Sequence, residues 1–118
     1  MSSRKLAVMF VLALASACGR PEPVECNNVS SDVTYQGQVK AILDAHCVSC
    51  HAADKSGPAR QGAPADVNLD TYAAAKEHAN TSAETTEKGE MPPAMSNDSM
   101  SDEDRCVLRG WINGGTRE

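Results

Sequence analysis

The chain carries the pattern C-V-S-C-H at residues 47–51, and no other feature restricts its fold as strongly. Two cysteine thiols two residues apart can reach the two vinyl groups of one porphyrin, and the imidazole of the adjacent histidine then lies under the iron on one face. This spacing is the attachment signature of c-type haem. The sequence therefore predicts one covalently bound haem, attached through Cys47 and Cys50, with His51 as an axial ligand of the iron.

Cys-x-x-Cys pairs also occur in redox dithiols and in zinc sites, but each alternative requires a context that this sequence lacks. A thioredoxin-like dithiol follows a strand and lies within a βαβ unit, whereas the residues before Cys47 have helical periodicity and no parallel-sheet strands follow. A zinc ribbon needs a second pair of ligands. The chain has no second C-x-x-C, and its only histidines are His46, His51 and His78. Haem attachment is therefore the favoured interpretation of the motif.

The first 17 residues have the layout of an export signal. Their only charges, Arg4 and Lys5, are basic, and an apolar run of ten residues follows at 6–15. This run is too short to cross a bilayer, which takes about 20 apolar residues. Residues 15–17 read Ala-Ser-Ala, the A-x-A pattern of a signal peptidase site. We therefore expect an exported protein whose mature chain begins at Cys18.

The same cleavage point resembles a bacterial lipobox, in which the new N-terminal cysteine carries a thioether-linked diacylglycerol. Cys18 is then the lipidated residue, although Ala15 occupies the position where leucine is usual. The polar segment after it is interrupted by proline and suits a tether. The alternative is a soluble secreted protein in which Cys18 is a spare thiol. We expect a signal peptide at 1–17, a lipid anchor and tether at 18–32, and a folded domain at 33–118.

Removal of the signal leaves nine basic and sixteen acidic side chains, and hence a net charge of −7 before any cofactor is counted. This balance argues against nucleic acid as a partner, because phosphate backbones are bound by clustered lysine and arginine. Only three aromatic side chains remain, which are Tyr35, Tyr72 and Trp111. A domain this small is only marginally stable unless disulfides, a metal or another group adds to its stability. We therefore expect something besides side chains to fill the interior.

The five cysteines can be divided among three tasks. If Cys47 and Cys50 bind haem and Cys18 carries lipid, Cys26 and Cys106 remain. An even remainder in an exported protein suggests a disulfide. Such a bridge would close a loop of about 80 residues and contribute roughly 4 kcal/mol in the chain-entropy model. We therefore predict a Cys26–Cys106 disulfide.

Two segments have one-sided apolar stripes at helical period. Residues 34–46 follow several capping residues, and this predicted helix delivers Cys47 at its end. The second segment, residues 101–113, opens with a serine cap and three carboxylates and stops at a Gly-Gly pair. Each of these helices contains an unfavourable glycine, Gly37 in the first and Gly110 in the last. A close crossing of the two helices would explain both glycines.

A third, shorter helix is expected at residues 71–78, where alanines give high helix propensity and Asp70 can cap the first turn. The polar stretches around 54–66 and 80–101 show neither helical nor strand periodicity. We therefore expect both stretches to be irregular.

The second axial ligand decides whether the haem carries electrons or binds a small molecule. Met91 is followed by two prolines, which fix the backbone directly after the side chain. A rigid polar loop that presents one soft thioether suits an iron ligand better than a core position, so we predict Met91. An open sixth position remains an alternative, as do four other side chains: Met95, Met100, His46 and His78. The two histidines are expected to be solvated.

Together these motifs resemble a monohaem class I cytochrome c, and more closely its exported bacterial branch. The resemblance covers residues 33–115 and rests on a helix leading to C-x-x-C-H, on Met-Pro-Pro at 91–93 and on Leu-x-x-Trp-Ile-x-x-Gly at 108–115. It implies an all-α fold in which the first and last helices cross and cover a covalently bound haem. It also implies that His51 and Met91 are the axial ligands.

The resemblance further implies two contacts in the loop after the motif. A proline carbonyl, from Pro58 or Pro64, accepts a hydrogen bond from the proximal imidazole. Arg60 either neutralises a haem propionate or remains a solvated loop residue. The departures from the family pattern are Gly37 and the cysteines before the first helix and within the last, which suggest a subgroup with an extra bridge.

With a His/Met pair, the protein would carry single electrons between redox partners through the exposed haem edge and would not be an enzyme. Its acidic charge suggests partners with a basic docking patch. Lipid on Cys18 would hold it at a bacterial membrane, on the periplasmic side. The alternative is a haem-based subunit that binds or acts on a gas or peroxide at an open sixth position, and a second rival is a structural lipoprotein without haem.

Overall fold

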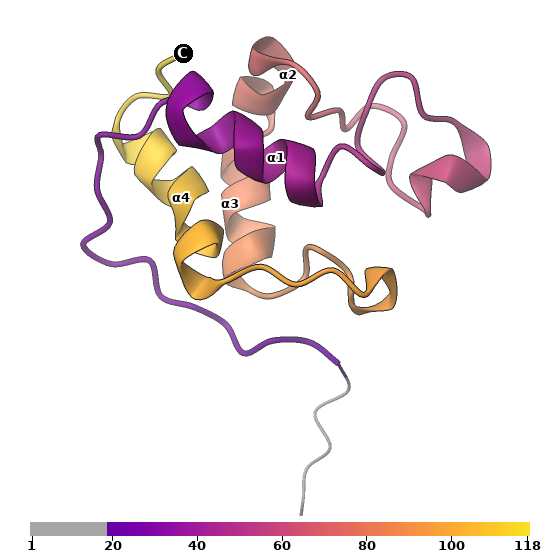
Figure 1. Cartoon of the computed structure of the whole chain (residues 1–118), viewed down its shortest axis with the longest axis horizontal. Helices are drawn as coiled ribbons and strands as arrows, with labels where there is room; N and C mark the ends of the chain where they lie inside the picture. The colour runs from indigo at the N-terminus through magenta and orange to yellow at the C-terminus, as the bar shows by residue number, and fades with distance from the viewer. Residues whose placement is uncertain (1–18) are drawn as a thin grey trace, which may run out of the picture.

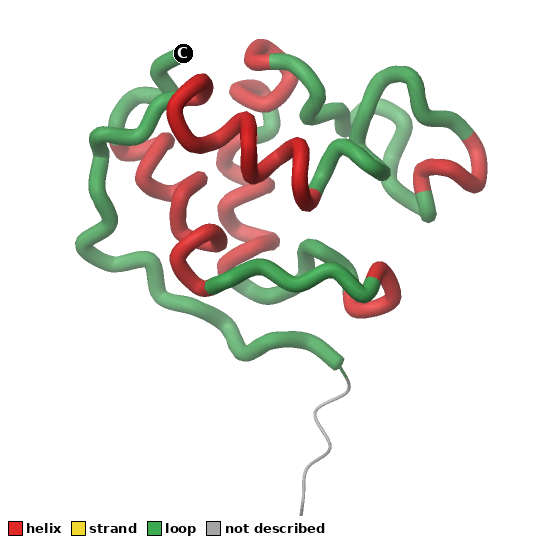
Figure 2. Tube along the Cα trace, viewed as in Figure 1, coloured by secondary structure: helices red, strands yellow, loops and turns green. Residues whose placement is uncertain are grey.

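The computed structural model describes residues 19–118, and within them the chain forms helices and loops without any strand (Figures 1 and 2). The predicted all-α class is therefore confirmed. The predicted export signal and the lipidation of Cys18 lie outside the described residues. In chain order the elements are a π-helical turn at Tyr35–Val39, α1 at Lys40–His46, a 3₁₀ turn at Gly57–Arg60, α2 at Tyr72–Glu77, α3 at Ala79–Glu87, a 3₁₀ turn at Ala94–Ser96 and α4 at Asp102–Asn113.

The π-helical turn and α1 together form one continuous helix, called the first helix below. It begins where the sequence predicts, but its first turn is wider than that of an α-helix. The Thr34 hydroxyl accepts from the Gly37 amide and caps this turn. Two further amides at the start of the turn donate to the carbonyls of Arg117 and Glu118, at 2.9 Å each. The C-terminal tail therefore supplies the acceptors that a helix N-terminus lacks within itself.

The core contains buried side chains from the first helix, α3 and α4. Of these, α3 and α4 run side by side (Figure 1). Trp111 is fully buried, and its ring centroid lies 6.1 Å from that of Tyr35 and 6.3 Å from that of Tyr72. The two tyrosine rings are 5.3 Å apart, and all three pairs are tilted. The indole nitrogen of Trp111 donates to the Arg117 carbonyl, and the Tyr72 hydroxyl donates to the Thr116 carbonyl. The indole N–H and the Tyr72 hydroxyl therefore hold the C-terminal tail against the core.

α3 corrects the expectation that residues 80–101 are irregular throughout. Its buried positions are Ala79, Ala83 and Thr86, which recur at helical spacing but are small. A stripe of small side chains gives little hydrophobic periodicity, so the sequence does not reveal it. These residues allow α3 to pack closely against α4, which joins it in the core.

α2 also differs from expectation in its cap. The Thr71 hydroxyl accepts from the Ala74 amide and is the N-cap. The Asp70 carboxylate instead accepts from the Ala53 amide across the loop. Asp70 therefore ties the end of the loop after the attachment motif back to its beginning.

The sequence suggested that a close crossing of two helices explains Gly37 and Gly110. The structure shows a different reason for each glycine. A Cβ added at Gly110 would overlap the carbonyl oxygen of Ser30 and approach Val33 to 3.1 Å. A Cβ at Gly37 would meet the Thr34 hydroxyl at 2.7 Å, within its own cap. Gly110 therefore makes room for the backbone that precedes the first helix.

The segment at residues 19–32 is bound to the domain over part of its length, so it is not a free tether throughout. The Cys26–Cys106 disulfide is present, as predicted, with the two Cα atoms 5.3 Å apart. The Val24 amide donates to the Glu87 carbonyl at the end of α3. The part that could act as a tether is therefore shorter than residues 18–32.

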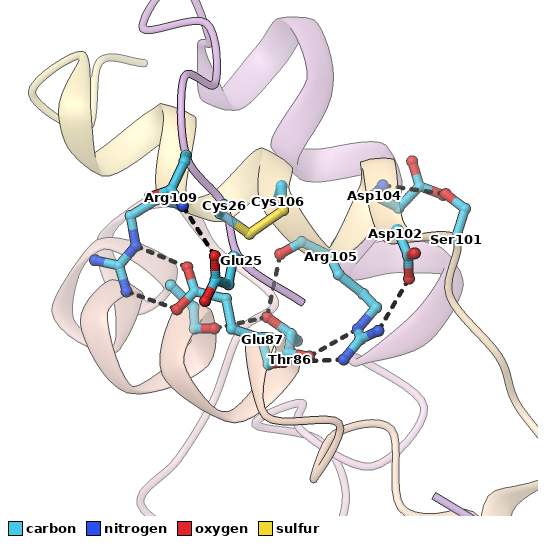
Figure 3. The surroundings of a disulfide bond; sticks show 12 residues. Glu25, Cys26, Thr86, Glu87, Ser101, Asp102, Asp104, Arg105, Cys106 and Arg109 are labelled. Atoms are coloured by element: carbon cyan, nitrogen blue, oxygen red, sulfur yellow. Dashed lines mark hydrogen bonds and ion pairs between the residues drawn. A yellow bond between two sulfur atoms is a disulfide. The ribbon is translucent and has the colours of Figure 1, made fainter. Parts of the chain in front are cut away.

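Arg105 is the centre of this arrangement (Figure 3). Its side chain is 3% exposed, and it donates to the carbonyls of Thr86, Glu87 and Glu22. An ion pair with Asp102 completes its contacts. One buried guanidinium therefore joins α4, the end of α3 and the N-terminal segment.

None of the helices in residues 19–118 is long and apolar enough to cross a membrane.

Candidate haem-binding site

The attachment motif forms a compact turn that continues directly from α1. The Cys47 amide donates to the Leu43 carbonyl, and the His51 amide donates to the Cys47 carbonyl, both at 2.9 Å. Cys47 and Cys50 are free thiols, and both are partly buried. The helix therefore ends by presenting two thiols and an imidazole within one turn, as the sequence predicted.

The Cys47 thiol lies in an environment that disfavours its charged form. Burial raises the pKa of Cys47 to about 12, and the nearby Asp98 and Cys50 add to this effect. The group is therefore a neutral thiol at physiological pH. A free thiol carries both the sulfur and the proton that addition across a vinyl group consumes.

The imidazole of His51 is oriented by the loop that follows it. Its Nδ1–H donates to the Val67 carbonyl over 3.1 Å, and the Leu69 amide donates to the His51 carbonyl over 2.8 Å. The expected acceptors, Pro58 and Pro64, do not make this contact, so that expectation is wrong. A backbone carbonyl has no residue-type signal, which is why the sequence could not identify Val67. With Nδ1 occupied, Nε2 is the nitrogen left for a metal.

Arg60 holds that loop together, and neither role expected for it describes its position. The side chain is only 5% exposed, so it is not solvated. Its donors are engaged within the loop instead of remaining free for a propionate. The acceptors are the carbonyls of Ala52, Lys55, Ala63, Pro64 and Val67 and the side-chain oxygen of Asn68.

Met91 lies in a second loop, which connects α3 to α4. The Met91 amide donates to the Thr85 carbonyl in the last turn of α3, so the start of the loop is fixed to the helix. Met91 is partly buried and lines a cavity of about 560 Å³ together with Met100. Met95 is 78% exposed. The contrast favours Met91 or Met100 over Met95 as a buried thioether ligand.

A polar contact joins the Met91 loop to the last residue of α1. The His46 Nδ1 donates to the Asp98 carboxylate, with the atoms 2.9 Å apart, and the His46 side chain is 17% exposed. His46 is therefore paired, and the expectation that it is solvated is wrong. Asp98 also lines the cavity beside Met91. The contact brings the Met91 loop to the end of α1, next to Cys47.

The comparison with known families decides the identity of this arrangement. The family model described as Cytochrome c matches residues 38–113, from the first helix through the attachment motif to the end of α4. The chain belongs to the cytochrome c family. No curated protein and no solved structure matches the chain.

Proteins of the cytochrome c family bind haem c covalently, one per chain, and carry electrons to and from redox partner proteins. The donor set of this cytochrome fits that cofactor. It offers two free thiols, an imidazole whose Nδ1 is already hydrogen-bonded, and a thioether in the opposite loop. Within the described residues, no group of three or more His, Cys, Asp or Glu side chains is placed to hold a metal ion.

Proposed function

We propose that this cytochrome carries one electron at a time, with His51 and Met91 as the two axial ligands of its haem iron. The contact between His46 and Asp98 is the observation that carries the proposal. It joins the end of α1, directly before the attachment motif, to the loop that contains Met91. The two proposed ligands, His51 and Met91, come from these two segments.

The two side chains have complementary tasks. His51 is held in the tautomer with a proton on Nδ1, because only a protonated nitrogen can donate to the Val67 carbonyl. Met91 contributes a neutral, soft thioether, which raises the reduction potential relative to a second histidine. Neither ligand has to gain or lose a proton when the electron arrives. When bound, the haem supplies the one-electron couple itself.

We further propose that this protein performs electron transfer only and catalyses no reaction of its own. With two protein ligands on the iron, no open position remains for a substrate. The predicted mature charge of −7 supports partners with a basic docking patch. Attraction between opposite charges speeds association at low ionic strength and is screened by salt.

The proposed location is the periplasmic side of a bacterial membrane, with lipid on Cys18. The first described residues after it, Gly19, Arg20 and Pro21, line the same cavity as Met91. A lipid on Cys18 would therefore be attached to the domain at a point close to the Met91 loop. This arrangement would keep the predicted sixth-ligand side near the membrane surface.

The ligand assignment is tested by replacing Met91 with alanine in the full chain, produced with its own signal and haem attachment. The reduced variant should bind carbon monoxide readily, whereas the wild type and a Met95→Ala control should not. Met95 is a matched control because it belongs to the same loop but is exposed. Carbon monoxide binding by the wild type, unchanged in Met91→Ala, would instead support the gas-binding alternative.

A further inference from the structure

Arg60 is a buried cation without a carboxylate partner. Its side chain is 5% exposed, and no ion pair involving it occurs within residues 19–118. A buried charge is costly unless its hydrogen bonds are satisfied. Here neutral oxygens satisfy them, at 2.9 Å to the Ala52 carbonyl and 3.1 Å to the Asn68 side chain. The guanidinium is therefore fully hydrogen-bonded by oxygens of the loop, but its charge is not neutralised.

One of these acceptors is shared with the proximal histidine. The Val67 carbonyl accepts from Arg60 Nη2 over 2.9 Å and from His51 Nδ1 over 3.1 Å. A carbonyl oxygen has two lone pairs, so both bonds can form together. The bond from Arg60 is charge-assisted, and such bonds are roughly twice as strong as bonds between neutral groups. Arg60 is therefore in a position to change how strongly Val67 attracts the His51 proton.

We propose that Arg60 is a positioning residue that raises the reduction potential of this cytochrome by acting on His51 through the Val67 carbonyl. The inference rests on the proposed function in one respect, since it takes His51 as an iron ligand. It does not require Met91 to be the second ligand.

The direction of the effect follows from the charges. An acceptor that pulls on the Nδ1 proton makes the imidazole a stronger electron donor, which favours ferric iron. Arg60 withdraws electron density from that acceptor, so the imidazole donates less. The positive guanidinium near the site also opposes the extra positive charge of the ferric state. Both effects favour the ferrous state and so raise the potential.

The test compares the reduction potentials of holoprotein variants at constant pH and salt. Arg60→Gln removes the charge and most of the donors and should shift the one-electron equilibrium about tenfold toward the oxidised form, about 59 mV. Arg60→Lys keeps the charge but cannot reproduce the fork of donors, so its shift should be smaller. Arg117→Gln, which changes an exposed arginine with the same charge, should shift the equilibrium less than twofold.

A purely structural role for Arg60 predicts a different result. In that case Arg60→Gln would lose stability while its potential stayed within twofold of the wild-type equilibrium, and the proposal would be overturned. The spectra separate this failure from a failure of the proposed function. A wild type without a histidine-ligated haem spectrum contradicts the proposed function, whereas normal spectra with unchanged potentials contradict only the role of Arg60.

The wild type gives a second test if Arg60→Gln does not fold. In the reduced protein, which is expected to be diamagnetic, the His51 Nδ1 proton should exchange slowly with solvent. It should also show a nuclear Overhauser effect to the Arg60 guanidinium protons, because both groups donate to one oxygen. Rapid exchange of that proton, or no contact with Arg60, would overturn the proposal.

Discussion

At the scale of single residues, backbone carbonyls determine how several side chains act. Val67 orients His51, and the carbonyls of Thr86 and Glu87 hold Arg105. Sequence analysis identifies the donors in such pairs by their residue type but has no means of identifying the acceptors. This explains why His51 was predicted while its partner Val67 was not.

Tyr35 leads to a prediction about alkaline pH. Burial raises the pKa of Tyr35 above its ordinary value of 10.0. The unfolded chain therefore releases the phenol proton at a lower pH than the folded protein does. Stability is retained below pH 10 and is lost as the pH rises through the folded-state pKa. Urea unfolding followed by Trp111 fluorescence should show this loss.

The matched variant for this effect is Tyr35→Phe, which keeps the ring and removes the ionisable group. Between neutral pH and pH values above 10, its stability should decrease less than that of the wild type. An equal decrease in both proteins would show that Tyr35 is not the group responsible.

At the scale of elements, the helices with large apolar stripes were predictable and the helix with a small stripe was not. The first helix and α4 are marked by Val39, Leu43, Leu108 and Trp111, all almost completely buried. α3 packs through alanines and a threonine, which give little contrast with exposed positions.

Gly110 provides a prediction at this scale, because two physical effects oppose each other. Helix propensity alone favours Gly110→Ala by about 1 kcal/mol. The added Cβ, however, would overlap the Ser30 carbonyl oxygen in the segment before the first helix. We expect the clash to dominate and destabilise the protein by about 1 to 3 kcal/mol. Asn80→Ala, on the exposed side of α3, serves as the control and should not destabilise.

Chemical denaturation of the holoprotein measures both variants. An increase in the free energy of unfolding for Gly110→Ala would mean that the N-terminal segment is not packed against α4 at this position. The sign of the change is therefore enough to decide.

At the scale of the whole molecule, two features attach the N-terminal segment to the helices, the Cys26–Cys106 disulfide and Arg105 (Figure 3). The disulfide could be predicted from the cysteine count, because the sequence motifs assigned the other three cysteines to haem attachment and lipidation. The contact between Arg105 and the Glu22 carbonyl could not, since it joins residues 83 positions apart through a backbone atom. The sequence therefore predicted the bridge but overestimated the length of the tether.

The proposed lipid anchor can be tested with the full chain produced in a bacterial host. A lipid on Cys18 should carry the cytochrome into the detergent-rich phase of a cloud-point separation, whereas Cys18→Ala should remain in the aqueous phase. The haem spectra of both forms should be the same, because Cys18 precedes the described domain. Aqueous partitioning of the unmodified sequence, together with an N-terminus lacking lipid in mass spectrometry, would favour the soluble secreted alternative.

The central claim is that His51 and Met91 together bind the haem iron, and the oxidised visible spectrum of the wild-type holoprotein tests it most directly. A bond between a thioether and ferric haem is expected to give a weak far-red band. We predict that this band is present in the wild type and in Met95→Ala and absent in Met91→Ala. A red wild-type protein without the band would contradict Met91 ligation, and a colourless protein would contradict haem attachment at Cys47 and Cys50.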